Sequence, residues 1–215
     1  MTVIMGATFV GGVAIAADTL LHDPNTMNKV MGSAKTLSIG NRVAVAQAGE
    51  FTGTYRVWEE LEKLDPASVT PEVAVDCIRR HAGAIHAERS KAGKELKTWY
   101  LVGGLGDGGI SILYSIAIHE DDVKRHVGDG QIIAIGTLPD ATDRATQAVR
   151  ASLKPMSNVA MLDEWVRRVV AEEAAASPKA VGFPATLLVV RPDVMIDAQV
   201  EEGGSHDSRL EGFFA

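Results

Sequence analysis

Four short apolar segments, separated by glycine-containing turns, occupy the first 50 residues of the chain. Residues 3–10 and 13–18 are expected to form one hairpin, and residues 36–39 and 43–47 a second one. Short apolar runs on both sides of a tight glycine turn are typical of paired β-strands. The chain is therefore expected to open with four strands, which commits it to a fold built on sheets.

The same opening segment has a second interpretation, because residues 1–17 carry no charge and contain Ala-x-Ala at residues 14–16. A secretory signal needs a positively charged start followed by a compact apolar helix. No Lys or Arg is present here, and Gly6, Gly11 and Gly12 interrupt the segment. It is also too rich in glycine for a membrane span. We therefore expect buried strands and a cytoplasmic protein.

Helical and extended periodicities alternate along the rest of the chain. Residues 52–64 and 70–92 show helical spacing, and Thr70 and Pro71 suit the cap and first turn of the second helix. Further strands are expected at residues 99–102, 110–118, 131–135, 185–190 and 194–198, and further helices after Asp140 and around residues 162–170.

This order predicts an α+β fold in a single domain, residues 1–215, because 215 residues can bury one core. Two sheets stacked face to face, each with a pair of helices outside it, would form a four-layer αββα sandwich. Residues 200–215 are polar until they end in Leu210, Phe213 and Phe214. They are expected to be a mobile tail or a tail that contacts another subunit, since exposed aromatic residues commonly find a pocket.

Composition excludes several classes of function. A net charge of -7 argues against binding of nucleic-acid phosphates. The single Cys77 excludes a disulfide framework and a cysteine-rich zinc site, and the six histidines lack ligand spacing. Gly104, Gly106 and Gly109 satisfy a dinucleotide-binding pattern, but a strand rather than a helix follows them, which favours a hairpin turn. No metal, no cofactor and no membrane partner is expected.

A nucleophile remains to be found, since the chain has no Gly-x-Ser-x-Gly elbow and Cys77 lies in a helical pattern. Thr2 directly follows Met1, so removal of Met1 would expose an amino-terminal threonine. Such a residue carries a nucleophilic hydroxyl and a base, because its α-amine titrates at about 7.7 to 8.0. A nearby Lys would favour the neutral amine by its charge, and an Asp would hold that Lys in place.

Four elements at the start of the chain together resemble the proteasome β-subunit group of N-terminal nucleophile hydrolases, including HslV-type peptidases and the smaller bacterial proteasome homologues. They are Thr2 before a strand, Ala17-Asp18-Thr19 at the end of the second strand, Lys35 before the third strand and Ala48-Gly49 at the end of the fourth. The resemblance implies the N-terminal nucleophile hydrolase fold. It also implies that Thr2 is the nucleophile, that Asp18 and Lys35 support it, and that the Gly49 N–H stabilises the oxyanion.

The resemblance further implies that Thr19, Ser33, Gln47 and Phe51 bind substrate. Two later segments depart from the family pattern. Gly128-Asp129-Gly130 stands where the family has Gly-Ser-Gly, so Asp129 would pair with the terminal amine or be a plain turn residue. Residues 177–182 lack the supporting acid that the family has in this region.

The function that this resemblance implies is a cytoplasmic, self-compartmentalising threonine peptidase that needs no cofactor. Its partners would be peptide or unfolded protein substrates, identical subunits in a double ring of about twelve to fourteen chains, and an unfolding ATPase. The two departures leave a non-catalytic ring protein open, and the same chemistry would also suit an amidase acting on a small amide.

Overall fold

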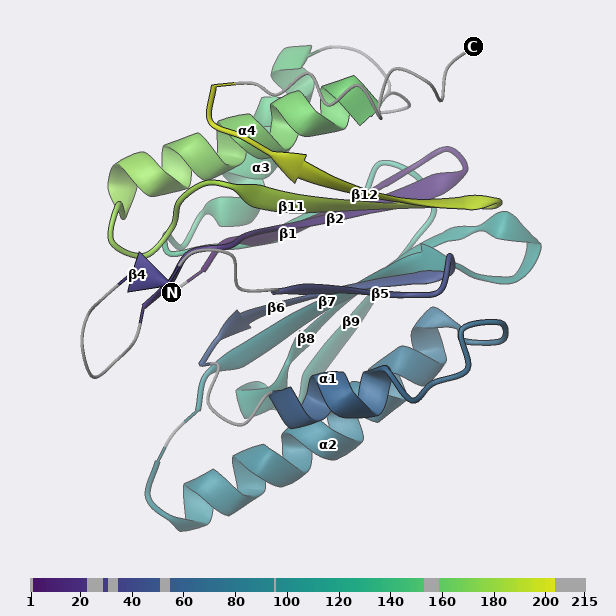
Figure 1. Cartoon of the computed structure of the whole chain (residues 1–215), viewed down its shortest axis with the longest axis vertical. Coiled ribbons are helices and arrows are strands. Elements are labelled where there is room, and N and C mark those ends of the chain that lie inside the picture. The colour runs from purple at the N-terminus through teal and green to yellow at the C-terminus, as the bar shows by residue number, and fades with distance from the viewer. Residues whose placement is uncertain are drawn as a thin grey trace.

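A computed structural model describes residues 2–22, 29–30, 35–50, 55–94, 96–152 and 159–203. Within these residues the chain forms two five-stranded antiparallel sheets, a small two-stranded sheet and four α-helices (Figure 1). The predicted tail lies outside the described residues from position 204 onward.

The first sheet joins strands from the two ends of the sequence. Its strands are, in spatial order, β10 (Ile132–Ile135), β1 (Ile4–Phe9), β2 (Gly12–Asp18), β11 (Ala185–Arg191) and β12 (Val194–Val200). All neighbouring strands are antiparallel, and β1 lies between β10 and β2. The amino end of the chain is therefore built into the interior of a sheet.

The second sheet follows the order of the sequence. Its strands are β5 (Thr36–Ile39), β6 (Val43–Gly49), β7 (Thr98–Leu105), β8 (Ser111–Ala117) and β9 (Asp122–Val127). The glycine-rich segment after β7 is a hairpin connection that contains a 3-10 turn (Asp107–Gly109), which confirms the turn predicted there. A second 3-10 turn (Ile118–Glu120) follows β8. The small sheet pairs β3 (Leu21–His22) with β4 (Lys29–Val30).

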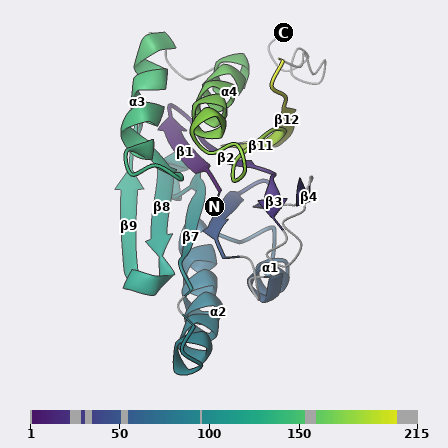
Figure 2. The same ribbon diagram turned by 90° about the vertical axis from the view of Figure 1, so that its left-hand side faces the viewer.

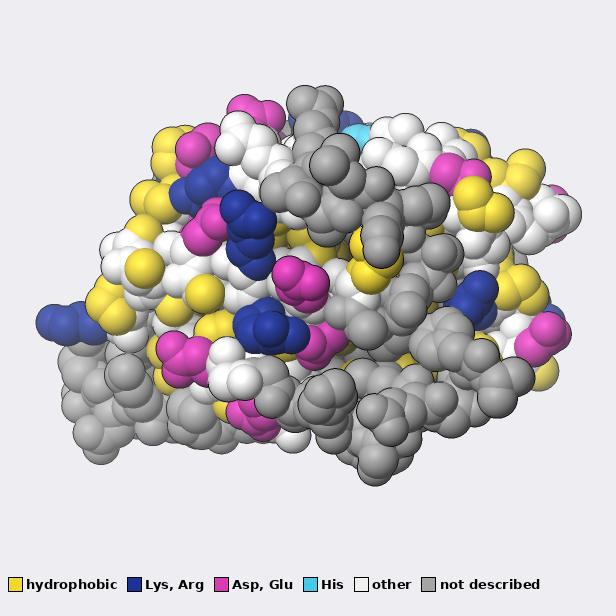
Figure 3. Space-filling view, turned by 90° about the horizontal axis from the view of Figure 1, so that it is seen from above, with side chains coloured by type: hydrophobic (Ala, Val, Ile, Leu, Met, Phe, Trp, Pro, Cys, Tyr) yellow, Lys and Arg dark blue, Asp and Glu magenta, His cyan; other side chains and the backbone are white. Residues whose placement is uncertain are grey.

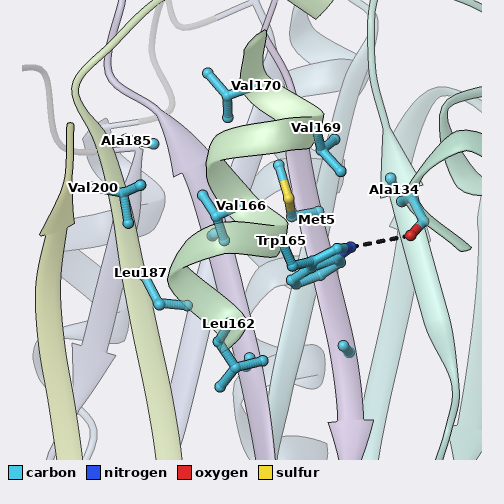
Figure 4. Close-up of a cluster of buried hydrophobic side chains, with 14 of the residues drawn as sticks. Met5, Ala134, Leu162, Trp165, Val166, Val169, Val170, Ala185, Leu187 and Val200 are labelled. Carbon is cyan, nitrogen blue, oxygen red and sulfur yellow. Dashed lines mark hydrogen bonds between the residues drawn. The ribbon is translucent and has the colours of Figure 1, made fainter. Parts of the chain in front are cut away.

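Helices cover the outer faces of the two large sheets, and three apolar clusters hold the assembly together. The helices α3 (Ala141–Ser152) and α4 (Val159–Ala176) lie over the first sheet, and α1 (Tyr55–Leu61) and α2 (Pro71–Lys91) lie over the second (Figure 1). In Figure 4, Trp165 and Val166 of α4 face Met5 of β1 and Leu187 of β11. A second cluster, which includes Ile4, fills the space between the sheets, and a third packs α1 and α2 against β6 and β7.

The outer surface of α4 carries charged residues of both signs. Arg168 pairs with Glu172 and Arg167 with Asp163, each one helical turn apart. Viewed from above, basic and acidic side chains are accordingly interspersed over the described part of this face (Figure 3). Within the described residues, no helix combines the length and the apolar character that crossing a membrane requires.

The predicted four-layer αββα sandwich with an N-terminal nucleophile hydrolase fold is wrong as a description of this chain. The described residues form a β sandwich of two antiparallel sheets, to which helices of very unequal length are added. α1 has only seven residues, whereas α2 has 21, so the helices do not form two matched pairs. The sequence pattern indicated the alternation of strands and helices, but it did not predict the length of each helix.

Candidate active site

A buried ion pair between Asp18 and Lys35 lies at the amino-terminal end of the sandwich. Asp18 is the last residue of β2, and Lys35 directly precedes β5 of the opposite sheet. Lys35 Nζ lies 3.0 Å from Asp18 Oδ1, and the two side chains are 1% and 0% exposed. The ammonium also donates to the Leu20 carbonyl at 2.6 Å. The pair therefore bridges the two sheets without access to water.

Thr2 is fixed beside this pair through the next residue in the chain. The Val3 N–H donates to Asp18 Oδ1 at 3.0 Å, the oxygen that also accepts from Lys35 at 3.0 Å. The Val3 nitrogen and the Lys35 nitrogen therefore lie no more than about 6 Å apart, twice the 3.0 Å hydrogen-bond distance. Figures 1 and 2 show this amino end between the two sheets. The structure thus brings Thr2 close to Asp18 and Lys35.

Burial and mutual attraction act in opposite directions on the two charged groups. Burial raises the pKa of the Asp18 carboxyl, although the Lys35 charge and the hydrogen bonds to Asp18 oppose this. Burial likewise lowers the pKa of the Lys35 ammonium, and the Asp18 charge opposes that shift. Each group therefore needs the other to remain charged, because an isolated charge at this depth would be neutralised. The positive charge near Thr2 depends on Asp18.

Gly49 ends β6 in a conformation that only glycine adopts readily. Its φ angle is 97°. A Cβ at this position would lie 2.0 Å from the Lys97 carbonyl oxygen. β6 also connects Gly49 to the ion pair, because the Gln47 N–H donates to the Lys35 carbonyl at 2.9 Å. The backbone conformation at Gly49 is thus tied to the strand that follows Lys35.

Asp129 is not brought to Thr2. Its turn is bonded to the far end of β1, where Thr8 Oγ1 donates to the Gly128 carbonyl at 2.6 Å and the Gly130 N–H donates to the Thr8 carbonyl at 2.9 Å. Thr8 lies six residue steps after Thr2 along an extended segment, about 20 Å at the usual strand rise. Asp129 itself is exposed. The interpretation that pairs Asp129 with the terminal amine does not fit this geometry.

The four predicted substrate-binding residues divide into two groups. Ser33 and Phe51 lie outside the described residues. The Thr19 hydroxyl donates to the Pro184 carbonyl at 2.7 Å. Gln47 is buried, and its amide nitrogen donates to the Glu50 carbonyl at 3.3 Å.

The side of the sheet on which Gln47 lies follows from strand alternation. Val45 packs among the residues under α1 and α2, and side chains two apart in a strand share a face. Gln47 therefore points toward the helices rather than into the space between the sheets. Its role in binding substrate stays a prediction.

Thr137, Glu173 and Arg144 form a cluster just after β10 that the sequence interpretation missed. β1 and β10 are antiparallel and pair from Ala7 with Ile132 to Ile4 with Ile135, so the cluster begins just beyond the last pair at the amino end of β1. Thr137 donates from its N–H at 2.9 Å and from its hydroxyl at 2.7 Å to Oε2 of Glu173, which is fully buried in α4. Glu173 also pairs with Arg144 of α3. The available signal was Gly136-Thr137 directly after the apolar run 132–135.

Other reactive side chains give no competing site in the described part of the chain. Cys77 is half-buried in α2, and burial, followed by the charge of Glu60, raises the pKa of its thiol. A raised pKa disfavours the thiolate that a nucleophilic cysteine needs. No group of three His, Cys, Asp or Glu side chains is arranged to hold a metal ion among the described residues.

Comparison with known proteins shows similarity at the level of fold. Two solved structures of Anbu from Hyphomicrobium sp. strain MC1 are similar, each with a TM-score of 0.67 and 17% sequence identity. For the first, a Gly-1 mutant, the match covers 98% of this chain and 92% of that chain. For the second, it covers 97% and 91%. No family model matches the sequence, and no curated protein matches it.

These findings correct the resemblance drawn from the sequence. The assignment to the proteasome β-subunit and HslV-type group of N-terminal nucleophile hydrolases is wrong: the similar structures are Anbu chains, and 17% identity shows the fold alone. Gly128–Gly130, aligned with the family's Gly-Ser-Gly as a departure, lies at the opposite end of β1 from Thr2. What remains is a fold similar to that of the Anbu structures and a buried Asp–Lys pair beside Thr2.

Proposed function

We propose that this chain is a threonine peptidase whose nucleophile is the Thr2 hydroxyl, freed as an amino-terminal residue by removal of Met1. The observation that carries the proposal is the Asp18–Lys35 ion pair, which is bonded through Asp18 Oδ1 to the residue directly after Thr2. A buried pair is costly to form and is weak support for stability. A role in catalysis would explain why the chain keeps this costly pair, because it holds a cation next to a potential amino-terminal nucleophile.

The proposed reaction needs only groups of this chain, the peptide and water. The free α-amine of Thr2 takes the hydroxyl proton while the oxygen attacks the peptide carbonyl carbon. The Lys35 charge would favour the neutral amine and the developing alkoxide, and the Gly49 N–H would stabilise the oxyanion. The peptide amine leaves with a proton, and water then hydrolyses the threonyl ester to release the acid and restore Thr2.

The proposal includes assembly into a closed compartment in the cytoplasm. The fold similarity to Anbu, a proteasome-related protein, supports a ring of identical subunits, here a double ring of about twelve to fourteen chains. Confinement would admit only peptides or unfolded proteins, delivered by an unfolding ATPase. The cytoplasm is supported by the use of the uncharged opening segment as the buried strands β1 and β2. Deletion of residues 211–215 should weaken assembly, measured by sedimentation.

The first experiment compares chains with and without Met1. The α-amine is acylated while Met1 remains, so only the processed chain should hydrolyse peptides or capture a peptide epoxyketone at residue 2. Intact mass gives the state of the amino end, and peptide mapping gives the labelled residue. Thr2→Ala should abolish turnover and labelling. Thr146→Ala is the matched control, because its hydroxyl lies in α3 and donates to the Thr142 carbonyl of the same helix at 2.8 Å.

Each outcome selects one function. Hydrolysis by a chain in which Met1 is fully retained contradicts the amino-terminal mechanism. A processed ring that captures no electrophile is a non-catalytic ring protein. A processed chain that turns over small amides but no peptides is an amidase, and a catalytically active 22.8 kDa monomer would contradict the closed compartment.

A further inference from the structure

Turns of both large sheets surround a cavity of about 700 Å³ at the end of the sandwich away from the amino terminus. The first sheet contributes the β11–β12 turn, residues 190–193, and the second contributes the β5–β6 turn, residues 40–42. Arg191 lies six residue steps after Ala185, which pairs with Asp18, so about 20 Å of strand separate it from the ion pair. Figure 1 shows both turns at the end of the sheets away from the label N. The cavity is therefore separate from the candidate active site.

Two arginine side chains reach this cavity from opposite sheets. Arg42 comes from the β5–β6 turn, and Arg191 is the last residue of β11. The arginine ion pairs found among the described residues all involve other arginines, namely Arg79, Arg125, Arg144, Arg167 and Arg168. The carboxylate of Asp65, near Arg42, already accepts from the Ala67 N–H at 3.0 Å and from the Ser68 hydroxyl at 2.7 Å. Both guanidiniums therefore keep donors available for an anion in the cavity.

The turns that line the cavity hold their shape without a ligand. Pro192 restricts the backbone of the β11–β12 turn. Gly40 packs directly on the loop before α2, since a Cβ there would lie 2.6 Å from the Pro66 carbonyl oxygen. In the β7–β8 connection, the Gly106 N–H donates to the Ile110 carbonyl at 2.9 Å. A ligand would therefore lose little affinity to ordering of the site.

The other lining groups indicate what the ligand carries besides an anionic group. Leu105 and Val190 are apolar, whereas Asn41 and Asp193 provide an amide and a carboxylate. The carboxylate accepts hydrogen bonds from hydroxyl groups and repels a second anionic group. The volume is in the range of small-molecule sites, about 300 to 1,000 Å³. A free phosphate ion would fill little of it, because a water molecule occupies only about 30 Å³.

We propose that this cavity binds a small phosphate monoester that also carries hydroxyl groups, such as a sugar phosphate. The phosphate group has a charge of about -1.5 to -2 at pH 7, which suits two guanidiniums better than the single charge of a carboxylate does. Arg42 and Arg191 would hold its oxygens through their planar sets of donors, and Asp193 would accept from a hydroxyl group of the ester. Binding would not depend on peptide hydrolysis, because the cavity lies at the other end of the sandwich from Thr2.

Isothermal titration calorimetry of the full-length protein with glucose 6-phosphate tests the site. We expect a Kd of about 1 mM or tighter. Arg42→Gln and Arg191→Gln should each raise the Kd by about tenfold or more, because each removes charge-assisted hydrogen bonds to the phosphate group. Arg168→Gln is the matched control, since Arg168 is half-exposed on the outer face of α4, where it pairs with Glu172. It should leave the Kd unchanged.

Two reference compounds separate the parts of the proposal. Glucose should not bind, and inorganic phosphate should bind at least about tenfold more weakly than the ester. Equal affinity for inorganic phosphate and the ester would contradict the proposal, because the cavity would then recognise the anion alone. Absence of binding of glucose 6-phosphate to the wild type at about 10 mM overturns it, as does a wild-type Kd in both arginine variants. Circular dichroism checks that each variant is folded, and if one is not, the other decides.

Discussion

Replacement of Lys35 by alanine tests the buried ion pair most directly. The substitution leaves the Asp18 carboxylate, 0% exposed, with hydrogen bonds from the Val3 and Leu20 N–H groups but no cation. It also removes the donor to the Leu20 carbonyl. Breaking a buried pair from one side typically costs about 3 to 5 kcal/mol of unfolding free energy. We therefore expect a loss in this range in addition to the loss of turnover.

The size of the loss should depend on pH in a direction that follows from Asp18. Burial raises the pKa of this carboxyl above its ordinary value, and loss of the Lys35 charge raises it further. A group with a raised pKa binds more protons in the folded state, so its unfavourable contribution is smallest below the unfolded-state pKa and grows as pH rises. The deficit of Lys35→Ala should therefore be smaller at about pH 5 than at about pH 8.

Urea unfolding at fixed protein concentration, followed by circular dichroism, measures these free energies. The double variant Lys35→Ala with Asp18→Asn should recover part of the loss, because no lone buried charge remains. Lys63→Ala is the surface control, since its partner Glu60 and the lysine itself are both solvent-accessible, and it should change little. A Lys35→Ala midpoint within error of the wild type at both pH values would refute the argument.

Three further predictions, which use four substitutions, are each measured by urea unfolding. The Tyr100 hydroxyl is buried and has no hydrogen-bond partner among the described residues, and burial raises its pKa. Wild-type stability should therefore fall above about pH 10 by up to about 1.4 kcal/mol per pH unit; Tyr100→Phe should lack this loss, and an identical pH dependence would contradict it. Gly49→Ala should lower the free energy of unfolding by about 2 kcal/mol or more. Gly83→Ala, in the open middle of α2, should instead raise it by up to about 1 kcal/mol, and equal effects of the two substitutions would contradict the prediction. Ser111→Ala should cost about 1 to 3 kcal/mol, because this buried hydroxyl bridges two backbone carbonyls at the β1–β2 turn; a neutral outcome would mean that water replaces it.

Local sequence patterns predicted several elements closely. The strand at residues 36–39 is observed as β5 with the same bounds, and the helix predicted at residues 70–92 is α2, Pro71–Lys91. β9, Asp122–Val127, was missed because it is a partly exposed edge strand with three charged residues and a histidine among six, so only its pairing with β8 defines it. Local patterns also could not predict which strands share a sheet, since β2 pairs with β11 from the other end of the chain.

The part of the candidate site that the sequence indicated came from the family resemblance. That resemblance grouped Asp18 and Lys35 with Thr2, and in the structure both lie at strand ends, where Asp18 bonds to Lys35 and to the Val3 N–H. Asp129 was misplaced because glycine turns at both ends of a sheet look alike in sequence, and only the β1–β10 register separates them. Glu173 lies on a helical face among alanines and valines, where burial of its carboxylate leaves no sequence signal.

The pairing of both chain ends in one sheet also sets an order of events during synthesis on the ribosome. β5 to β9 form a contiguous block, so the second sheet can be completed while later residues are still being made. The β1–β2 hairpin is made first, but its partner β11 begins only at Ala185. Until then its apolar residues have no sheet neighbour on that side, and a nascent chain in this state is prone to aggregation. We expect the emerging hairpin to be the segment that ribosome-associated chaperones protect, and Asp18, opposite Ala185, to be buried last.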